Sequence, residues 1–167
     1  MTKAVVPFTP VAPGAALPRA VQVTGLWQLG REARQDDIRA QHALAKTAVE
    51  SGEVTALIQA ITAKPTAREF GVLIDELIGS FAPRQGQDMG TFGKMLTKDV
   101  AGLGASRVAL EAAAAQLRAN CTFLPAIEEV LEAVKWQKQV IDARVHLLER
   151  LPARVALAEK LIEPGQE

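Results

Sequence analysis

No proline or glycine interrupts the chain between Pro125 and Pro152, and this uninterrupted segment restricts the fold more than any other feature. The simplest interpretation is one helix of about 27 residues, which would be about 40 Å long at a rise of about 1.5 Å per residue. A small globule does not need a helix of this length. Pro152 should kink or restart the helix, and residues 153–162 should continue it as a shorter amphipathic piece.

The apolar residues of this long helix fall into two stripes. The first follows a heptad spacing with one lysine in it and consists of Ile127, Leu131, Val134, Lys138, Ile141, Val145 and Leu148. The second lies beside it and consists of Trp136, Val140, Ala143 and Leu147. A single bundle face rarely covers two stripes, so one should serve the chain's own core while the other faces a second molecule.

The segment that leads into the long helix marks a junction between two helices. We place Pro125 at the first helical position, where its missing N–H is not needed, with Glu128 in the first turn. Phe123 and Leu124 should pack back against Ile127. We therefore expect Phe123 to be buried.

Shorter amphipathic helices precede the junction, and each begins at a capping residue. Thr66 and Glu69 have the capping-box spacing, while Asp88 and Ser106 are candidate N-caps. The apolar faces that follow the first two caps consist of Phe70, Leu73, Ile74, Leu77, Ile78 and Phe81, and of Met89, Phe92, Met95, Leu96, Val100 and Leu103. Because the apolar residues recur at intervals of three and four, we expect both faces to be buried.

The chain divides into four predicted segments. Residues 1–25 carry Pro7, Pro10, Pro13 and Pro18 and should form a disordered lead. Residues 26–52 should form a solvated amphipathic helix with a thin apolar stripe, or a helix that docks on a partner. Residues 53–134 should form a helical bundle, and residues 135–162 should extend the long C-terminal helix. The expected fold class is all-α.

Charge and composition exclude several classes of function. The chain has 19 basic and 19 acidic side chains, so no net field draws it to nucleic acid, and we expect no tight direct nucleic-acid binding. No run approaches the ~18 apolar residues that would span a membrane. One cysteine, Cys121, cannot form an internal disulfide, and His42 and His146 suggest no metal site. These features are typical of a cytoplasmic protein.

No catalytic constellation stands out. The glycines Gly86, Gly90 and Gly93 lack the following Lys-Ser/Thr of a phosphate-binding loop. The glutamates of the long helix are better interpreted as surface charges at a helix start, and Cys121 as a packed thiol. We expect a protein that is not an enzyme and needs no cofactor.

The junction also carries a family resemblance. The segment Phe123-Leu124-Pro125-Ala126-Ile127-Glu128-Glu129-Val130-Leu131 resembles the Phe-Leu-Pro-Ser/Thr-x-x-Glu/Gln-Phe/Val segment of phage replication proteins that load the host replicative helicase, as in lambda-like phages. Upstream, Leu77 to Phe81 and Phe92 to Gly104 resemble the preceding helices of that family. The resemblance covers about residues 73–136. Phe92 stands where the family commonly has tryptophan, and Ala126 where it has serine or threonine. No segment of this sequence resembles the long helicase-binding C-terminal part of the larger loaders.

The resemblance implies a non-enzymatic phage or prophage DNA-replication accessory that binds a replicative helicase, as a loader or as an inhibitor. The alternative is a structural or assembly adaptor that forms a helical homo-oligomer and has no replication role. The predicted partner-binding residues are Trp136, Val140, Leu147, Phe123, Leu124 and Pro125.

Overall fold

The computed structural model describes residues 35–83 and 88–162, and within these ranges it confirms an all-α fold. In chain order the helices are α2 (Gln35–Glu50), α3 (Glu53–Thr62), α4 (Ala67–Gly79), α5 (Met89–Gly102), α6 (Arg107–Asn120), α7 (Ile127–Glu149) and α8 (Leu151–Ile162). The predicted disordered lead, residues 1–25, lies outside the described residues.

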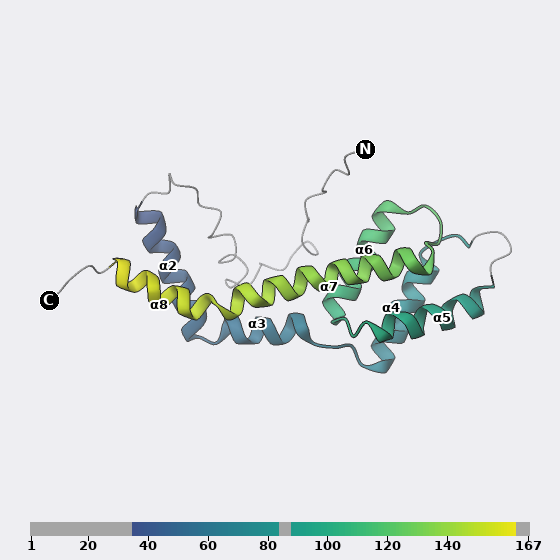
Figure 1. Cartoon of the computed structure of the whole chain (residues 1–167), viewed down its shortest axis with the longest axis horizontal. Helices are drawn as coiled ribbons and strands as arrows, with labels where there is room; N and C mark the ends of the chain where they lie inside the picture. The colour runs from purple at the N-terminus through teal and green to yellow at the C-terminus, as the bar shows by residue number, and fades with distance from the viewer. Residues whose placement is uncertain (1–34, 84–87, 163–167) are drawn as a thin grey trace.

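Helices α7 and α8 run end to end along the long axis of the molecule (Figure 1). The first of them ends at Glu149, Arg150 caps it, and the next begins at Leu151. Pro152 has no N–H to donate to the carbonyl of Leu148, and its ring would crowd that carbonyl, so the helix restarts here. The predicted interruption at Pro152 is therefore confirmed, and the longer of the two pieces has 23 residues.

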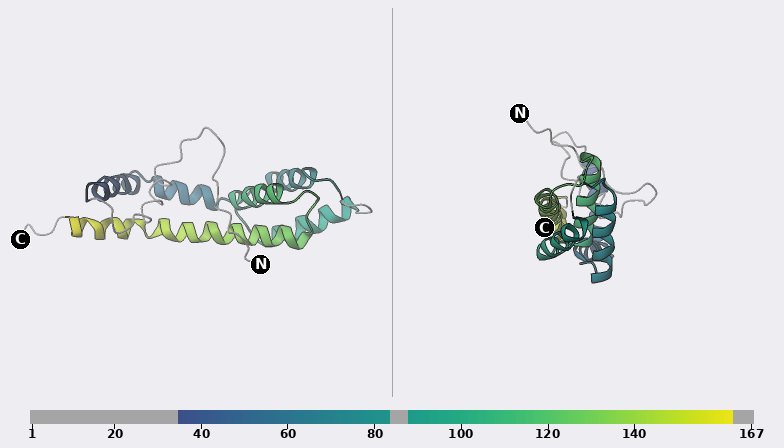
Figure 2. Two further views of the ribbon diagram at one scale, coloured as in Figure 1. Left: turned by 90° about the horizontal axis from the view of Figure 1, so that it is seen from above. Right: turned by 90° about the vertical axis from the view of Figure 1, so that its right-hand side faces the viewer.

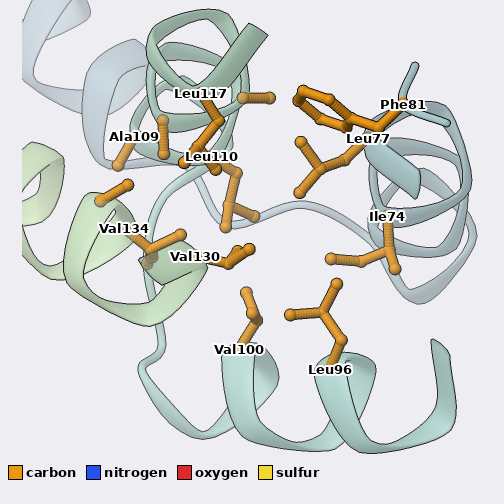
Figure 3. Close-up of a cluster of buried hydrophobic side chains, with 14 of the residues drawn as sticks. Ile74, Leu77, Phe81, Leu96, Val100, Ala109, Leu110, Leu117, Val130 and Val134 are labelled. Carbon is orange, nitrogen blue, oxygen red and sulfur yellow. The ribbon is translucent and has the colours of Figure 1, made fainter. Parts of the chain in front are cut away.

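One hydrophobic core lies where α4, α5 and α6 meet the N-terminal half of α7. Figure 3 shows side chains of this cluster converging from all four helices, among them Leu77, Leu96, Leu117 and Val130. The buried residues of this bundle core are Ile74, Leu77, Phe81, Phe92, Leu96, Val100, Ala105, Ala109, Leu110, Ala113, Ala114, Leu117, Leu124, Val130, Ala133, Val134 and Ile141. The spacing of three and four residues along each helix produces these faces.

A second core lies at the other end of the molecule, where α2 and α3 pack against α8 and the end of α7. Its buried residues are Ala45, Ala48, Val54, Leu148, Leu151 and Val155. An ion pair of 2.6 Å joins Lys46 Nζ to Glu159 Oε1, and His42 Nε2 lies 3.2 Å from the carbonyl oxygen of Val155. The stripe of α2 is thus covered by the C-terminal helix of the same chain, over 100 residues away.

The two cores divide the chain differently from the predicted segments. Residues 53–134 were expected to form one bundle, but α3 contributes Val54 to the second core. Residue 134 falls inside α7, which contributes to both cores because it is longer than either. The left view of Figure 2 shows α7 and α8 along one edge of the molecule, and α2, α3 and α6 lie beside them on a single side.

The predicted helix starts at Thr66, Asp88 and Ser106 are confirmed by their capping hydrogen bonds. The start of α7 differs, and the prediction that Pro125 occupies the first helical position was wrong. Ala126 is the N-cap, and its N–H donates to Glu129 Oε2 at 2.7 Å. Since the glutamate satisfies that N–H, the helix begins at Ile127 and Pro125 lies before the cap, buried.

The capping box of α4 leads to a stability prediction. The N–H and hydroxyl of Thr66 both donate to Glu69 Oε2 at 2.8 Å, and Arg107 Nη1 donates to Oε1 at 2.9 Å. The two hydrogen bonds from Thr66, followed by the charge of Arg107, hold the pKa of Glu69 below its ordinary value of 4.5. A carboxylate whose pKa is lowered by folding stabilises the folded state at pH values above its ordinary pKa. This stabilisation is lost as the pH falls through the pKa of the folded state.

Thr66→Ala is therefore expected to lower the free energy of unfolding by about 1 kcal/mol at neutral pH. The difference from wild type should shrink below pH 4.5, where protonation of Glu69 removes the hydrogen bond to the carboxylate. Urea denaturation at neutral and acidic pH measures both effects. Thr55→Ala, at an exposed position on α3, is the control. An equal loss at both pH values would contradict the role assigned to Glu69.

Candidate partner-binding surface

The second predicted stripe of the long helix lies on the outside of the molecule. Trp136 is 57% exposed and Leu147 is 44% exposed, Ala143 is exposed, and Val140 is half-buried. The heptad stripe, by contrast, places Val134, Ile141 and Leu148 in the cores. We call the set Trp136, Val140, Ala143 and Leu147 the outward stripe. The structure confirms the separation of the two stripes, while the partner role of the outer one stays a prediction.

A buried polar contact sets the rotation of α7 about its axis. Gln137 is 7% exposed, and its Nε2 donates to Gln116 Oε1 of α6 at 2.8 Å. Burying an amide is costly without a partner, so this bond favours one rotation of α7 against α6. Because successive residues turn by about 100° around a helix, holding Gln137 inward turns Trp136 outward.

Phe123 and Leu124 lie on opposite sides of the junction. Leu124 is 1% exposed, and its N–H donates to the carbonyl oxygen of Ala82 at 3.1 Å, whereas Phe123 is 59% exposed. The expectation that Phe123 is buried was therefore wrong. Successive side chains of extended backbone point in opposite directions, so only one of the two can enter the core.

This arrangement changes the predicted set of partner-binding residues. Leu124 and Pro125 are buried and offer a partner almost no surface, so their main role is to hold the junction in place. Phe123, Trp136 and Leu147 are large, apolar and exposed, and Val140 lies partly exposed between the last two. These four residues remain as candidate contacts.

A shallow groove next to the junction was not predicted. It has a volume of about 540 Å³ and lies between α5 and the first turns of α7, with Met95 and Pro125 among its lining residues. Met95 was expected on the buried face of α5, but it is 52% exposed. Phe92, Leu96 and Val100 already fill the face toward the core, and Met95 falls at its edge. No signal within one helix could reveal a groove that two helices form together.

The other residues that the sequence singled out have structural roles. Cys121 is partly buried against the bundle core, as expected of a packed thiol. Glu129 caps α7, and His146 is exposed. Within residues 35–83 and 88–162, no group of three or more His, Cys, Asp or Glu side chains could hold a metal ion.

A comparison with known protein families, with curated proteins and with solved structures finds no match to this chain. In residues 35–83 and 88–162, no helix combines the length and the apolar composition that a membrane span requires.

Proposed function

We propose that this protein is a non-enzymatic DNA-replication accessory of a phage or prophage, and that it binds a replicative helicase through the outward stripe of α7 together with Phe123. The observation that carries the proposal is the exposure of Trp136 and Leu147 on a helix whose other face is anchored in two cores. Aromatic anchors on rigid elements are typical of residues that dominate binding energy.

The proposed identity of the partner rests on the resemblance to helicase loaders. The residues that carry it, about 73–136, span most of α4, all of α5 and α6 and the beginning of α7, which pack around the bundle core. Phe123 and Trp136 lie on the surface of this unit. Loading and inhibition both begin with binding to the helicase, and binding is the step that we propose for the outward stripe.

A capture experiment with purified bacterial replicative helicase tests the proposal. Trp136→Ala combined with Leu147→Ala should abolish capture, since it removes the two large exposed side chains of the stripe. The melting temperature should change little, because Trp136 and Leu147 are 57% and 44% exposed and neither fills a core. Thermal denaturation of the double variant checks that point.

The matched control is Val72→Ala combined with Leu157→Ala. These residues are 48% and 60% exposed on α4 and α8, so the control also shortens two exposed apolar side chains, but away from the outward stripe. Capture by this control together with loss in the stripe variant would support the proposal. Equal capture by both variants would place the contact elsewhere, and absence of capture by the wild-type protein would contradict the helicase partner.

A further inference from the structure

The outward stripe is nearly symmetric along α7. Trp136 lies five residues before Ile141, and Leu147 lies five residues after Asp142. Val140 and Ala143 are likewise one residue from those two positions. If a second copy of α7 packs antiparallel on this stripe, Trp136 of each copy meets Leu147 of the other, and Val140 meets Ala143. The small residues at the centre allow close approach of the helices, and the large ones fill the two ends.

Two charged residues beside the outward stripe, Glu132 near its N-terminal end and Arg150 near its C-terminal end, are placed so that opposite charges would meet in an antiparallel pair. Glu132 and Arg150 are exposed, and they fall on the same flank of the stripe because 18 residues, 150 minus 132, make about five full turns. In an antiparallel pair each flank meets its own counterpart, so Glu132 of one copy faces Arg150 of the other. A parallel pair would instead leave Glu132 and Arg150 about 27 Å apart along the helix axis, at a rise of about 1.5 Å per residue, so the two could not pair. The charge order therefore favours the antiparallel arrangement.

Neither charge is explained by contacts with the residues that the structure describes. Among the described residues, Glu132 and Arg150 form no ion pair, whereas Lys138 and Asp142 on the same helix pair with each other at 2.9 Å. The helix dipole favours acidic residues in the first turn, but Glu132 is the sixth residue of α7 and lies beyond it.

We infer that the outward stripe binds a second copy of this chain as an antiparallel, two-fold symmetric dimer, with Glu132 of each subunit paired to Arg150 of the other. The inference rests on the outward stripe being a contact surface, as the proposed function does, but not on a helicase partner. Since both contacts use Trp136 and Leu147, dimerisation would hide the helicase-binding surface, and the two complexes would compete.

Charge reversal with rescue tests the dimer on the full-length protein alone. Sedimentation equilibrium is measured from micromolar to sub-millimolar protein. Glu132→Arg and Arg150→Glu should each weaken the dimer about tenfold or more, because each change places two like-charged pairs at the interface. The double variant Glu132→Arg with Arg150→Glu should restore the wild-type dissociation constant. Asp75→Arg, an equal change of net charge at an exposed site on α4, should leave it unchanged.

Rescue in the double variant, with both single variants weakened, supports the antiparallel dimer. A wild-type protein that stays monomeric throughout the concentration range overturns it, as do single variants that dimerise normally or a double variant that does not recover. Thermal denaturation of each variant identifies loss of folding. Helicase capture by Glu132→Arg separates the two proposals, because this change leaves the outward stripe intact. Capture should persist in that variant even when the dimer is lost.

Discussion

Leu124→Ala is expected to lower the free energy of unfolding by about 3–5 kcal/mol, the largest effect of any single change at the junction. The side chain is 1% exposed and belongs to the bundle core, so its removal leaves a cavity between helices that are already held in place. The backbone bond from Leu124 to Ala82 restrains the segment and limits how far it can collapse into that cavity. Urea denaturation measures the loss.

The neighbouring residue provides the matched control. Phe123→Ala removes a larger side chain, yet it should cost less than about 1 kcal/mol because the ring is 59% exposed. Comparing the two variants thus separates the effect of side-chain burial on stability from the effect of side-chain size. A greater loss for Phe123→Ala than for Leu124→Ala would reverse the assignment of core and surface at this junction.

Leu151→Ala is expected to destabilise the second core by about 2–5 kcal/mol and to affect one end of the molecule more than the other. Leu151 is 3% exposed, and it packs with residues of α2 and α3 close to the restart of the C-terminal helix. Because the second core has few buried residues, its helices should open before the bundle does.

Native-state hydrogen exchange can resolve this difference residue by residue. In Leu151→Ala, amide protection should fall in α2 and α8 and stay near the wild-type level in α5 and α6. A uniform loss across all these helices would show that the two cores unfold as one unit. Leu157→Ala, at a 60% exposed site on the same helix, is the control and should leave protection unchanged in both regions.

The candidate contact residues depend on both hydrophobic cores for their positions. The bundle core holds Phe123 and Trp136 in position, whereas Leu147 lies next to Leu148 of the second core. A partner that contacts the whole outward stripe therefore requires both ends of the molecule to be folded. Loss of the second core in Leu151→Ala should weaken capture or dimerisation even though no contact residue has changed.

Local sequence predicted those features that depend on residues within a turn or two of each other. The cap at Thr66 is an example, because its partner Glu69 lies three residues away and the geometry of one helical turn brings the two together. The interruption at Pro152 and the separation of Val134 from Trp136 on α7 are of the same kind. Helical periodicity is a local property, so the sequence carries it directly.

Where the local sequence permits several arrangements equally well, tertiary structure decides which one is adopted. Phe123 and Leu124 are both apolar, and local sequence does not distinguish them, but the position of Ala82 and the space left in the bundle core admit only Leu124. In the same way, the sparse stripe of α2 could have faced water or another protein. It is covered by α8 because Ala45 and Ala48 can bury apolar area against Val155 there. Contacts between residues so far apart depend on the packing of the whole chain, which no local pattern encodes.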